Sequence, residues 1–305
     1  MSLPAKHTTH VLKDMREILR DRMDEALRDL RKLDKRSGDE RIHTTRKRFK
    51  EIRALLRLVR EKLGTRIYRR ESRLWRSAGR PLSALRDATI LMGSLDAMIQ
   101  RSHWSVKASR FEPLRRRLLR QQKKARSQVR RHCLSEIVPL VEEARNRAQL
   151  WSRDRCAWGV TTVGLMRMYV AGRVAMRTAL SGRSNVALHD WRKRVTALRY
   201  AFEALQCIRP QRIAMMARRA RALSTLLGDD HDLAVLQHVA RQESERHGST
   251  DVSELLEVID RRRTTLQEGA FSIGGELFLE TRAQVLGRFN AYWKAGRWRT
   301  IRQPA

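Results

Sequence analysis

The sequence predicts an all-α protein because turn residues and aromatic residues are few and the apolar residues recur at helical spacing. Only 15 Gly and 6 Pro occur among 305 residues, and aromatic residues make up 6% of the chain. A protein built on sheets needs more turn residues and more β-branched and aromatic runs than this. Apolar residues, 41% of the chain, recur at helical spacing through every long segment and are numerous enough to bury a core.

The first half of the chain divides into helices at recognisable turn signals. The helices expected here span 7–34, 40–63, 66–79, 82–101 and, as one or two elements, 110–150. Ser37-Gly38-Asp39 ends the first of them. Gly64 ends the second, because glycine tolerates the left-handed conformation that follows a helix. Pro81 is expected to separate the third from the fourth, since proline disrupts a helix interior.

The second half shows the same order of elements. Residues 151–160 have no clear period and form the expected boundary. The helices expected after it span 161–180, 186–208, 211–227, 229–247, 251–268 and 276–296. Pro210 and Gly228 mark two of the breaks between them. We therefore predict a first helical-bundle repeat over 7–150 and a second over 161–300, which together form one domain.

The balance of charge predicts an anionic partner. The chain carries 66 Lys and Arg against 33 Asp and Glu, which gives a formal net charge of +33. Such an excess repels itself in a compact fold unless a polyanion neutralises it. Of the basic residues, 54 are arginine, whose planar fork matches phosphate oxygens in pairs. A GC-rich genome also favours arginine over lysine, but it does not explain the excess of base over acid.

Cysteine usage and hydropathy exclude several other classes of protein. Cys133, Cys156 and Cys207 are too few and too far apart for a disulfide framework or a Cys-x-x-Cys zinc site. The N-terminal segment has no apolar signal-peptide core, and no run of about 18 consecutive apolar residues occurs anywhere. We therefore expect a soluble cytoplasmic protein, and we assign it no metal and no cofactor.

Two pairs of segments in the chain resemble one another. Residues 42–53 align with 188–199 at a constant offset of 146 positions, with His, Arg, Lys, Arg and the final Arg identical. Residues 86–91 align with 231–236 at an offset of 145 positions. This order predicts an internal repeat.

A stripe of basic residues accompanies the apolar face of the helix that begins near residue 40. Its members recur at three- and four-residue spacing and are His43, Arg46, Lys50, Arg53, Arg57 and Arg60. A similar stripe in the next segment consists of Arg69, Arg73, Arg76 and Arg80. Like charges at this spacing repel by about 0.2–0.5 kcal/mol per pair, which a bound polyanion would relieve. An ordinary solvated face is the other interpretation, but such a face mixes charges of both signs.

These motifs resemble those of the CHAD family, the conserved histidine α-helical domain. The motifs are His43-x-x-Arg46-Lys47-x-x-Lys50-x-x-Arg53, then Arg86-Asp87, then His189-x-x-Arg192-Lys193 with Arg199-Tyr200, and finally Leu227-Gly228-Asp229-Asp230-His231-Asp232-Leu233. They appear in the family's order, and the resemblance covers roughly residues 10–295. It implies two four-helix-bundle halves related by a pseudo-twofold axis. It also implies a basic groove or pore that binds inorganic polyphosphate, without catalysis, and targets the protein to polyphosphate granules.

The stripes and the resemblance together predict the polyphosphate-binding residues. They are His43, Arg46, Lys47, Lys50, Arg53, Arg57, Arg69, Arg73, Arg76, Arg80, Arg86, His189, Arg192, Lys193, Arg199, Arg218, Arg219 and Arg221. Thr196 and Glu203 stand where the first half has Lys50 and Arg57, so the second half is expected to bind less strongly.

Three alternative functions are weighed against this one. The positive charge would also attract nucleic acid, and we expect the protein to bind nucleic acid loosely. Specific binding is not favoured, because no helix-turn-helix is visible in the sequence and few aromatic residues interleave with the basic stripes. An HD-type metal-dependent phosphohydrolase would use His189-Asp190 and Asp229-Asp230-His231-Asp232. However, His189 is better explained by its repeat partner, and Asp87 and Asp232 by pairing with arginine or capping a helix. Membrane binding is not expected, since the apolar faces are needed for the cores. We assign no catalytic residue.

Overall fold

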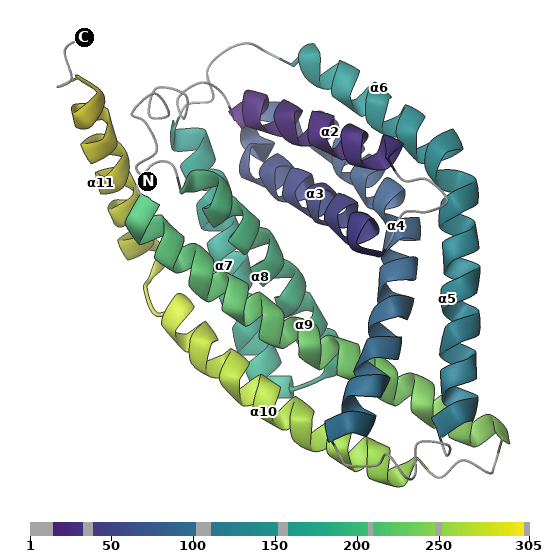
Figure 1. The fold of residues 1–305 in the computed structure, drawn as a ribbon. Helices are drawn as coiled ribbons and strands as arrows, with labels where there is room; N and C mark the ends of the chain where they lie inside the picture. The colour runs from purple at the N-terminus through teal and green to yellow at the C-terminus, as the bar shows by residue number, and fades with distance from the viewer. Residues whose placement is uncertain are drawn as a thin grey trace, which may run out of the picture.

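The structure is a computed structural model of the chain, and it describes residues 15–32, 39–101, 111–151, 158–206, 210–247 and 252–301. These residues form ten α-helices and one π-helical turn, with no strand among them, which confirms the all-α fold class. The helices are α2 (Met15–Arg31), α3 (Asp39–Leu58), α4 (Arg60–Arg101), α5 (Glu112–His132), α6 (Val138–Gln149), α7 (Trp158–Gly182), α8 (Asn185–Leu205), α9 (Pro210–His247), α10 (Ser253–Leu277) and α11 (Arg282–Ile301), as Figure 1 shows. Within the described ranges, none of them is both long and apolar enough to cross a membrane.

Two of the predicted helix breaks are wrong. α4 continues through Pro81, and α9 continues through Gly228. A proline inside a helix costs about 3 kcal/mol because it removes a backbone hydrogen bond and crowds the preceding turn. Around Pro81 the packing offsets this cost, since Ala78, Leu82 and Leu85 on the same helix are all buried. A glycine inside a helix costs only about 1 kcal/mol relative to alanine, so buried neighbours readily carry α9 through Gly228.

The chain reverses between α3 and α4 close to the predicted position. Gly64, near the start of α4, has a φ of 74°, in the left-handed region that favours glycine. α3 itself ends earlier than predicted, at Leu58. The reversal makes the two helices antiparallel, so that Arg46 near the start of α3 meets Ser83 in the middle of α4.

The boundary predicted after residue 268 is also wrong, because α10 continues to Leu277. One glycine in this stretch, Gly274, allows a close packing contact. A Cβ at Gly274 would lie 2.7 Å from the Trp191 ring, so this glycine lets α10 approach α8 closely. The last helix begins at Arg282 rather than near residue 276.

Two other predicted features of the chain agree with the structure. The basic segment over 110–150 forms α5 and α6, joined by the π-helical turn η2 (Cys133–Ile137) just before Pro139. α7 begins at Trp158, inside the predicted boundary region. The predicted helical residues 7–14 and the boundary residues 152–157 lie outside the described part of the chain.

The helices that carry the repeated motifs meet at the middle of the molecule. α2 to α6 occupy one side and α7 to α11 the other (Figure 1). α3 packs against α7 and α8, and α4 packs against α9. The contact between the two sides is therefore made by the helices that hold the basic stripes and their counterparts.

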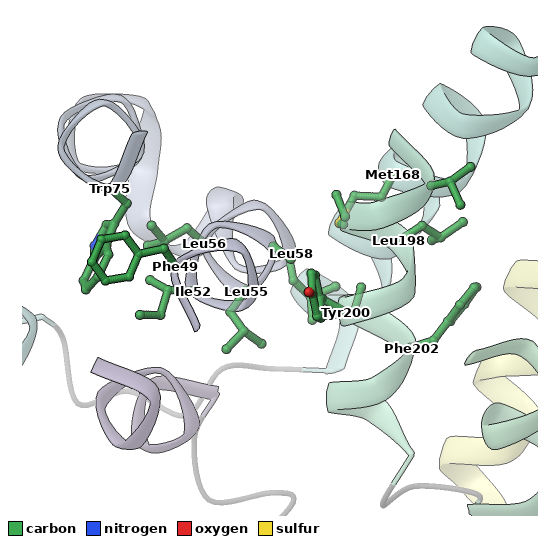
Figure 2. Close-up of a cluster of buried hydrophobic side chains, with 14 of the residues drawn as sticks. Phe49, Ile52, Leu55, Leu56, Leu58, Trp75, Met168, Leu198, Tyr200 and Phe202 are labelled. Atoms are coloured by element: carbon green, nitrogen blue, oxygen red, sulfur yellow. The ribbon is translucent and has the colours of Figure 1, made fainter. Parts of the chain in front are cut away.

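One hydrophobic core runs through this contact. It includes buried residues of α3 and α4, where Phe49 packs edge-on against Trp75 with ring centroids 5.0 Å apart, and buried residues of α7 and α8, such as Met168 and Phe202 (Figure 2). α7 crosses the end of α3 at Gly164, where a Cβ would lie only 2.0 Å from the carbonyl oxygen of Leu58. A second apolar cluster joins the far ends of α4, α5, α9 and α10.

Candidate anion-binding site

The first group of site residues lies where α3 packs against α4. Arg46 donates from Nε to Ser83 Oγ at 3.0 Å and forms an ion pair from Nη2 to Asp87 Oδ1 at 3.0 Å. Arg86 donates from Nε to His43 Nδ1 at 3.0 Å. Burial and the nearby cations, Arg86 first among them, lower the pKa of His43, so the ring stays a neutral acceptor. The spacing of the motif thus places these side chains in one bonded group.

The second group lies where α8 packs against α9. The rings of His189 and His231 are stacked, with centroids 4.4 Å apart and an interplanar angle of 29°. Burial, then Arg192 and His189, lowers the pKa of His231 to about 3. The Nδ1 atom of His189 is buried and has no hydrogen-bond partner among the residues that the structure describes. Arg192 lies beside Gly228, where a Cβ would be 3.9 Å from its Nε atom. An added Cβ would make an ordinary van der Waals contact there, so the guanidinium packs directly against this part of α9.

Lys50 lies between the two groups. Arg46 from its own helix and Arg192 and Arg199 from α8 act on it electrostatically, together with the carboxylate of Asp87. Burial, followed by Arg46 and Arg192, lowers the pKa of Lys50 from 10.5 to about 7. Among the described residues, no carboxylate forms an ion pair with Lys50 or Arg192. Cations from both halves therefore lie together, and the carboxylates of Asp87, Asp229 and Asp232 act on Arg192 without forming an ion pair with it in the described part of the chain.

We call these side chains the central cluster. It consists of His43, Arg46, Lys50, Arg86, His189, Arg192 and His231.

Three arginines extend the central cluster along α3 and α4. Arg53 and Arg57 are one turn apart on α3, and Arg76 comes from α4; we call them the first triplet. Burial, then Arg57 and Arg76, lowers the pKa of Arg53 to about 10. The Nε atom of Arg53 is buried and has no acceptor. Within the described ranges, none of the three forms an ion pair with a carboxylate. Arg76 is exposed and the other two are half-buried, so it is the buried, unpaired Nε of Arg53 beside two further cations that indicates a place for an external anion.

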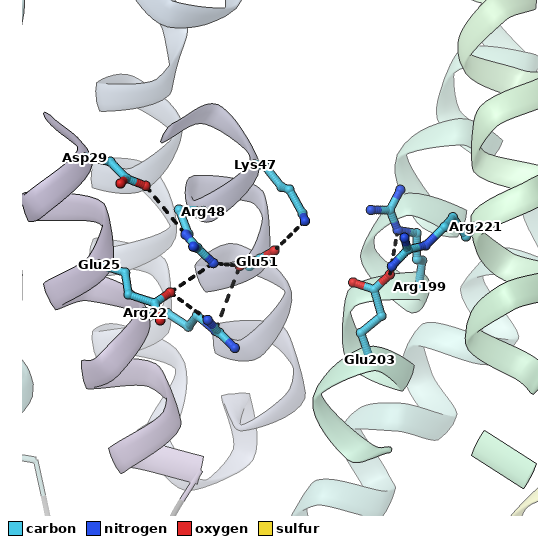
Figure 3. Close-up of polar contacts among 9 residues, drawn as sticks. All are labelled: Arg22, Glu25, Asp29, Lys47, Arg48, Glu51, Arg199, Glu203 and Arg221. Atoms are coloured by element: carbon cyan, nitrogen blue, oxygen red, sulfur yellow. Dashed lines mark hydrogen bonds and ion pairs between the residues drawn. The ribbon is translucent and has the colours of Figure 1, made fainter. Parts of the chain in front are cut away.

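The matching positions of α8 and α9 hold Arg199, Glu203 and Arg221, which we call the second triplet. Arg199 Nε lies 3.0 Å from Glu203 Oε1, and Arg221 Nη2 lies 2.7 Å from the same oxygen (Figure 3). The guanidinium of Arg199 also covers the ring of Tyr200, at 4.7 Å from its centroid. Unlike the first triplet, this one contains its own anion.

A cavity of about 240 Å³ opens at one end of the central cluster, between α4, α9 and α10. Its charged lining consists of Arg86, Asp229, Asp232 and Arg262. Burial, opposed by Arg192, raises the pKa of Asp232 to about 6. This end of the site therefore mixes both signs of charge, whereas the triplet end of the first half is purely basic.

Seven of the predicted binding residues do not belong to these groups, although Lys47 and Lys193 act electrostatically on His43 and His189. Three are engaged by nearby carboxylates: Lys47 by Glu51 at 3.9 Å (Figure 3), Lys193 by Asp190 at 3.6 Å, and Arg219 by Glu276 at 3.3 Å. Four are exposed on α4 and α9 and are Arg69, Arg73, Arg80 and Arg218. The structure thus gathers eleven of the eighteen predicted residues around the contact between the halves.

The family of the protein follows from the same stretch of chain. Residues 21–241 match the CHAD domain. The chain belongs to the CHAD family. Comparison with curated proteins finds no match. The matched CHAD region begins within α2 and ends within α9, so it contains the central cluster and both triplets, while α10 and α11 follow it.

Sequence reasoning missed three polar residues of this CHAD site. His231 stands where the repeat has Arg86, and that alignment could have identified it. Asp87 was expected to pair with an arginine, which its bond to Arg46 confirms, but it was not placed in the site. Ser83 accepts a hydrogen bond from Arg46, and no feature of the sequence marks it.

The chemistry available to this CHAD site is the binding of several linked anions. Guanidinium groups form short, charge-assisted hydrogen bonds with phosphate oxygens and can do so in pairs. A di-histidine metal centre does not suit the geometry, because the stacked rings of His189 and His231 direct their nitrogens in roughly parallel planes rather than toward one point. In the described part of the chain, no group of three His, Cys, Asp or Glu side chains is placed to hold a metal ion.

Proposed function

We propose that this protein binds inorganic polyphosphate, without catalysis, through the central cluster and the first triplet. The observation that carries the proposal is the set of cations at the contact between the halves that have no carboxylate partner among the described residues: Lys50, Arg53, Arg57, Arg76 and Arg192. Holding these charges together is costly in the free protein, as the lowered pKa values of Lys50 and Arg53 indicate. A chain of phosphates supplies the missing charge at each of them.

Polyphosphate fits the arrangement better than nucleic acid. The cations of α3 follow one another at intervals of three or four residues, which is a rise of about 5 Å per step. A flexible chain with a charge on every repeating unit can meet such a row continuously. Proteins that bind single-stranded nucleic acid rely on aromatic rings that stack with the bases. Here the two tyrosines beside the row are covered by arginine, Tyr68 by Arg60 and Tyr200 by Arg199. CHAD domains are associated with polyphosphate and its granules, and we extend that role, including granule targeting, to this chain.

We further propose that the two halves form an internal repeat about a pseudo-twofold axis, with boundaries near 7–150 and 161–300. The support is that residues related by the sequence offsets of 146 and 145 positions have corresponding neighbours in the two halves. His43 contacts Arg86, and His189 contacts His231. Arg46 likewise contacts Ser83, and Arg192 lies beside Gly228.

The decisive experiment removes the first triplet. We expect Arg53→Gln/Arg57→Gln/Arg76→Gln to weaken binding of long-chain polyphosphate by at least tenfold at 150 mM salt, because each hydrogen bond to a charged group contributes about 1.5–3 kcal/mol. Isothermal titration calorimetry measures the change, and circular dichroism checks that helicity is kept. The matched control is Arg120→Gln/Arg241→Gln/Arg261→Gln, which removes three exposed arginines from α5, α9 and α10.

Two outcomes would contradict the proposal. The first is an equal loss of affinity in both triple variants, which would mean that net charge alone determines binding. The second is easy displacement of polyphosphate from the wild-type protein by RNA of matched charge, which would favour nucleic acid as the ligand. We expect RNA to displace polyphosphate poorly.

A further inference from the structure

The two triplets occupy equivalent positions but differ by one residue. Arg199, Glu203 and Arg221 follow Arg53, Arg57 and Arg76 at the offsets of the repeat, 146 positions on α3 and α8 and 145 on α4 and α9. In both halves the first two members are one helical turn apart and the third comes from the next helix. The exchange of Arg57 for Glu203 is therefore the main difference in charge at this place.

Glu203 holds both arginines of its triplet through a single oxygen. Arg199 and Arg221 lie 3.0 Å and 2.7 Å from Oε1 (Figure 3). Arginine binds phosphate oxygens through the same kind of charge-assisted N–H···O⁻ hydrogen bond that it forms with this carboxylate. Glu203 thus stands where the oxygen of a ligand would otherwise lie.

The contact between Arg199 and Glu203 is not a loose surface ion pair. Their side chains are only 16% and 19% exposed, so solvent screens their attraction weakly, whereas Arg221, the second partner of Glu203, is 58% exposed. The ring of Tyr200 lies under the Arg199 guanidinium and fixes its plane. A phosphate chain would have to displace Glu203 from both arginines before it could bind them.

The first triplet presents the opposite situation. Its three cations have no carboxylate partner in the described part of the chain, and Arg53 Nε is buried without an acceptor. The first triplet carries three positive charges that a ligand can neutralise, and the second carries a net single charge, because Glu203 accepts a hydrogen bond from each of its two arginines.

We propose that Glu203 is a built-in anion that closes the second triplet to phosphate and so sets how many phosphates the site holds. This inference rests on the proposed polyphosphate function. It makes Glu203 a specificity-determining residue: the ligand is bound along the first half, reaches Lys50 and Arg192 at the contact between the halves, and does not continue to Arg221.

The test is to remove the charge of Glu203 while keeping its size. Glu203→Gln frees Arg199 and Arg221 for the ligand. Each added phosphate contact steepens the dependence of log K on log salt by about 0.7 for a flexible polyanion. We therefore expect the slope for long-chain polyphosphate to rise by about 1, with a several-fold gain in affinity and more phosphates covered per protein at saturation.

The matched control is Glu276→Gln, which makes the same change in net charge and also frees an arginine, Arg219, at 3.3 Å. It is expected to leave the slope unchanged, because that pair lies between α9 and α10, away from the central cluster. A second control places Glu203→Gln in an Arg199→Gln/Arg221→Gln background, where it should add nothing. A gain that persists there, or that equals the gain of Glu276→Gln, would overturn the inference.

The converse variant tests the same idea in the first half. Arg57→Glu should reproduce the second triplet and reduce affinity several-fold more than Arg57→Gln, because the new carboxylate can engage Arg53 and Arg76. Equal losses in the two variants would count against the inference even if Glu203→Gln failed to fold.

The failure of the inference can be told apart from the failure of the proposed function. If wild-type protein does not bind polyphosphate at all, the proposed function fails. If it binds and Glu203→Gln has the wild-type slope, only the inference about Glu203 fails.

Discussion

Lys50 connects binding to pH through a single side chain. In the free protein its pKa is about 7, lowered by burial and by Arg46 and Arg192. A bound polyanion favours the charged form and moves that pKa back toward 10.5. Between the two values the complex holds more protons than the free protein, so affinity falls as pH rises. His231 and Asp232, with pKa values of about 3 and about 6, act in the same direction because an anion nearby raises both.

We therefore expect the affinity for long-chain polyphosphate to fall by up to about tenfold per pH unit between pH 7 and 9, which is the limit for one linked proton. Titration calorimetry in two buffers of different ionisation enthalpy reports the proton uptake directly. The control is Lys50→Met, which keeps the length and apolar stem of the side chain and should flatten the profile in this range. An unchanged profile in Lys50→Met would show that another group carries the pH dependence.

At the scale of the element, the crossing of α7 over the end of α3 depends on one glycine. A Cβ at Gly164 would lie 2.0 Å from the Leu58 carbonyl oxygen, and backbone atoms cannot move aside as a side chain can. We expect Gly164→Ala to lower the free energy of unfolding by about 1–3 kcal/mol, despite the better helix propensity of alanine. The control is Gly93→Ala in α4, where no atom lies within 4 Å of the added Cβ and a gain of about 0.5–1 kcal/mol is expected. Thermal unfolding of both variants compares them, and equal stabilities would contradict the close approach.

The elements also show how far a sequence can predict this fold and site. Helical spacing identified the helices, because an apolar stripe is a local property of the chain. The breaks at Pro81 and Gly228 were predicted wrongly, because tertiary packing offsets a local penalty that the sequence shows by itself. Lys50 and Lys47 lie three residues apart on α3, yet Arg192 and Arg199 of α8 act on Lys50 while Lys47 meets Glu51 of its own helix. That difference depends on the position of α8, which the sequence pattern of α3 does not reveal.

The whole molecule carries its charge unevenly, and this bears on how a polyanion affects stability. With a net charge of +33, the folded chain repels itself, and so does the unfolded chain, which can also bind polyphosphate. A ligand stabilises a protein only to the extent that it prefers the folded state. The folded state offers what the unfolded chain lacks: Lys50, Arg53 and Arg192 held together at the contact between the halves, with their pKa values lowered until an anion arrives.

We therefore expect long-chain polyphosphate to raise the melting temperature of the wild-type protein. At a free concentration about 100 times the Kd, the gain in unfolding free energy approaches about 2.7 kcal/mol if the unfolded chain binds negligibly, and less if it competes. Differential scanning fluorimetry at constant ionic strength measures the shift. Arg53→Gln/Arg57→Gln/Arg76→Gln should lose most of it, whereas Arg120→Gln/Arg241→Gln/Arg261→Gln, with the same net charge, should keep it. A shift of equal size in both variants would mean that polyphosphate stabilises the fold by screening its overall charge, and that the cations between the two halves have no special part in the effect.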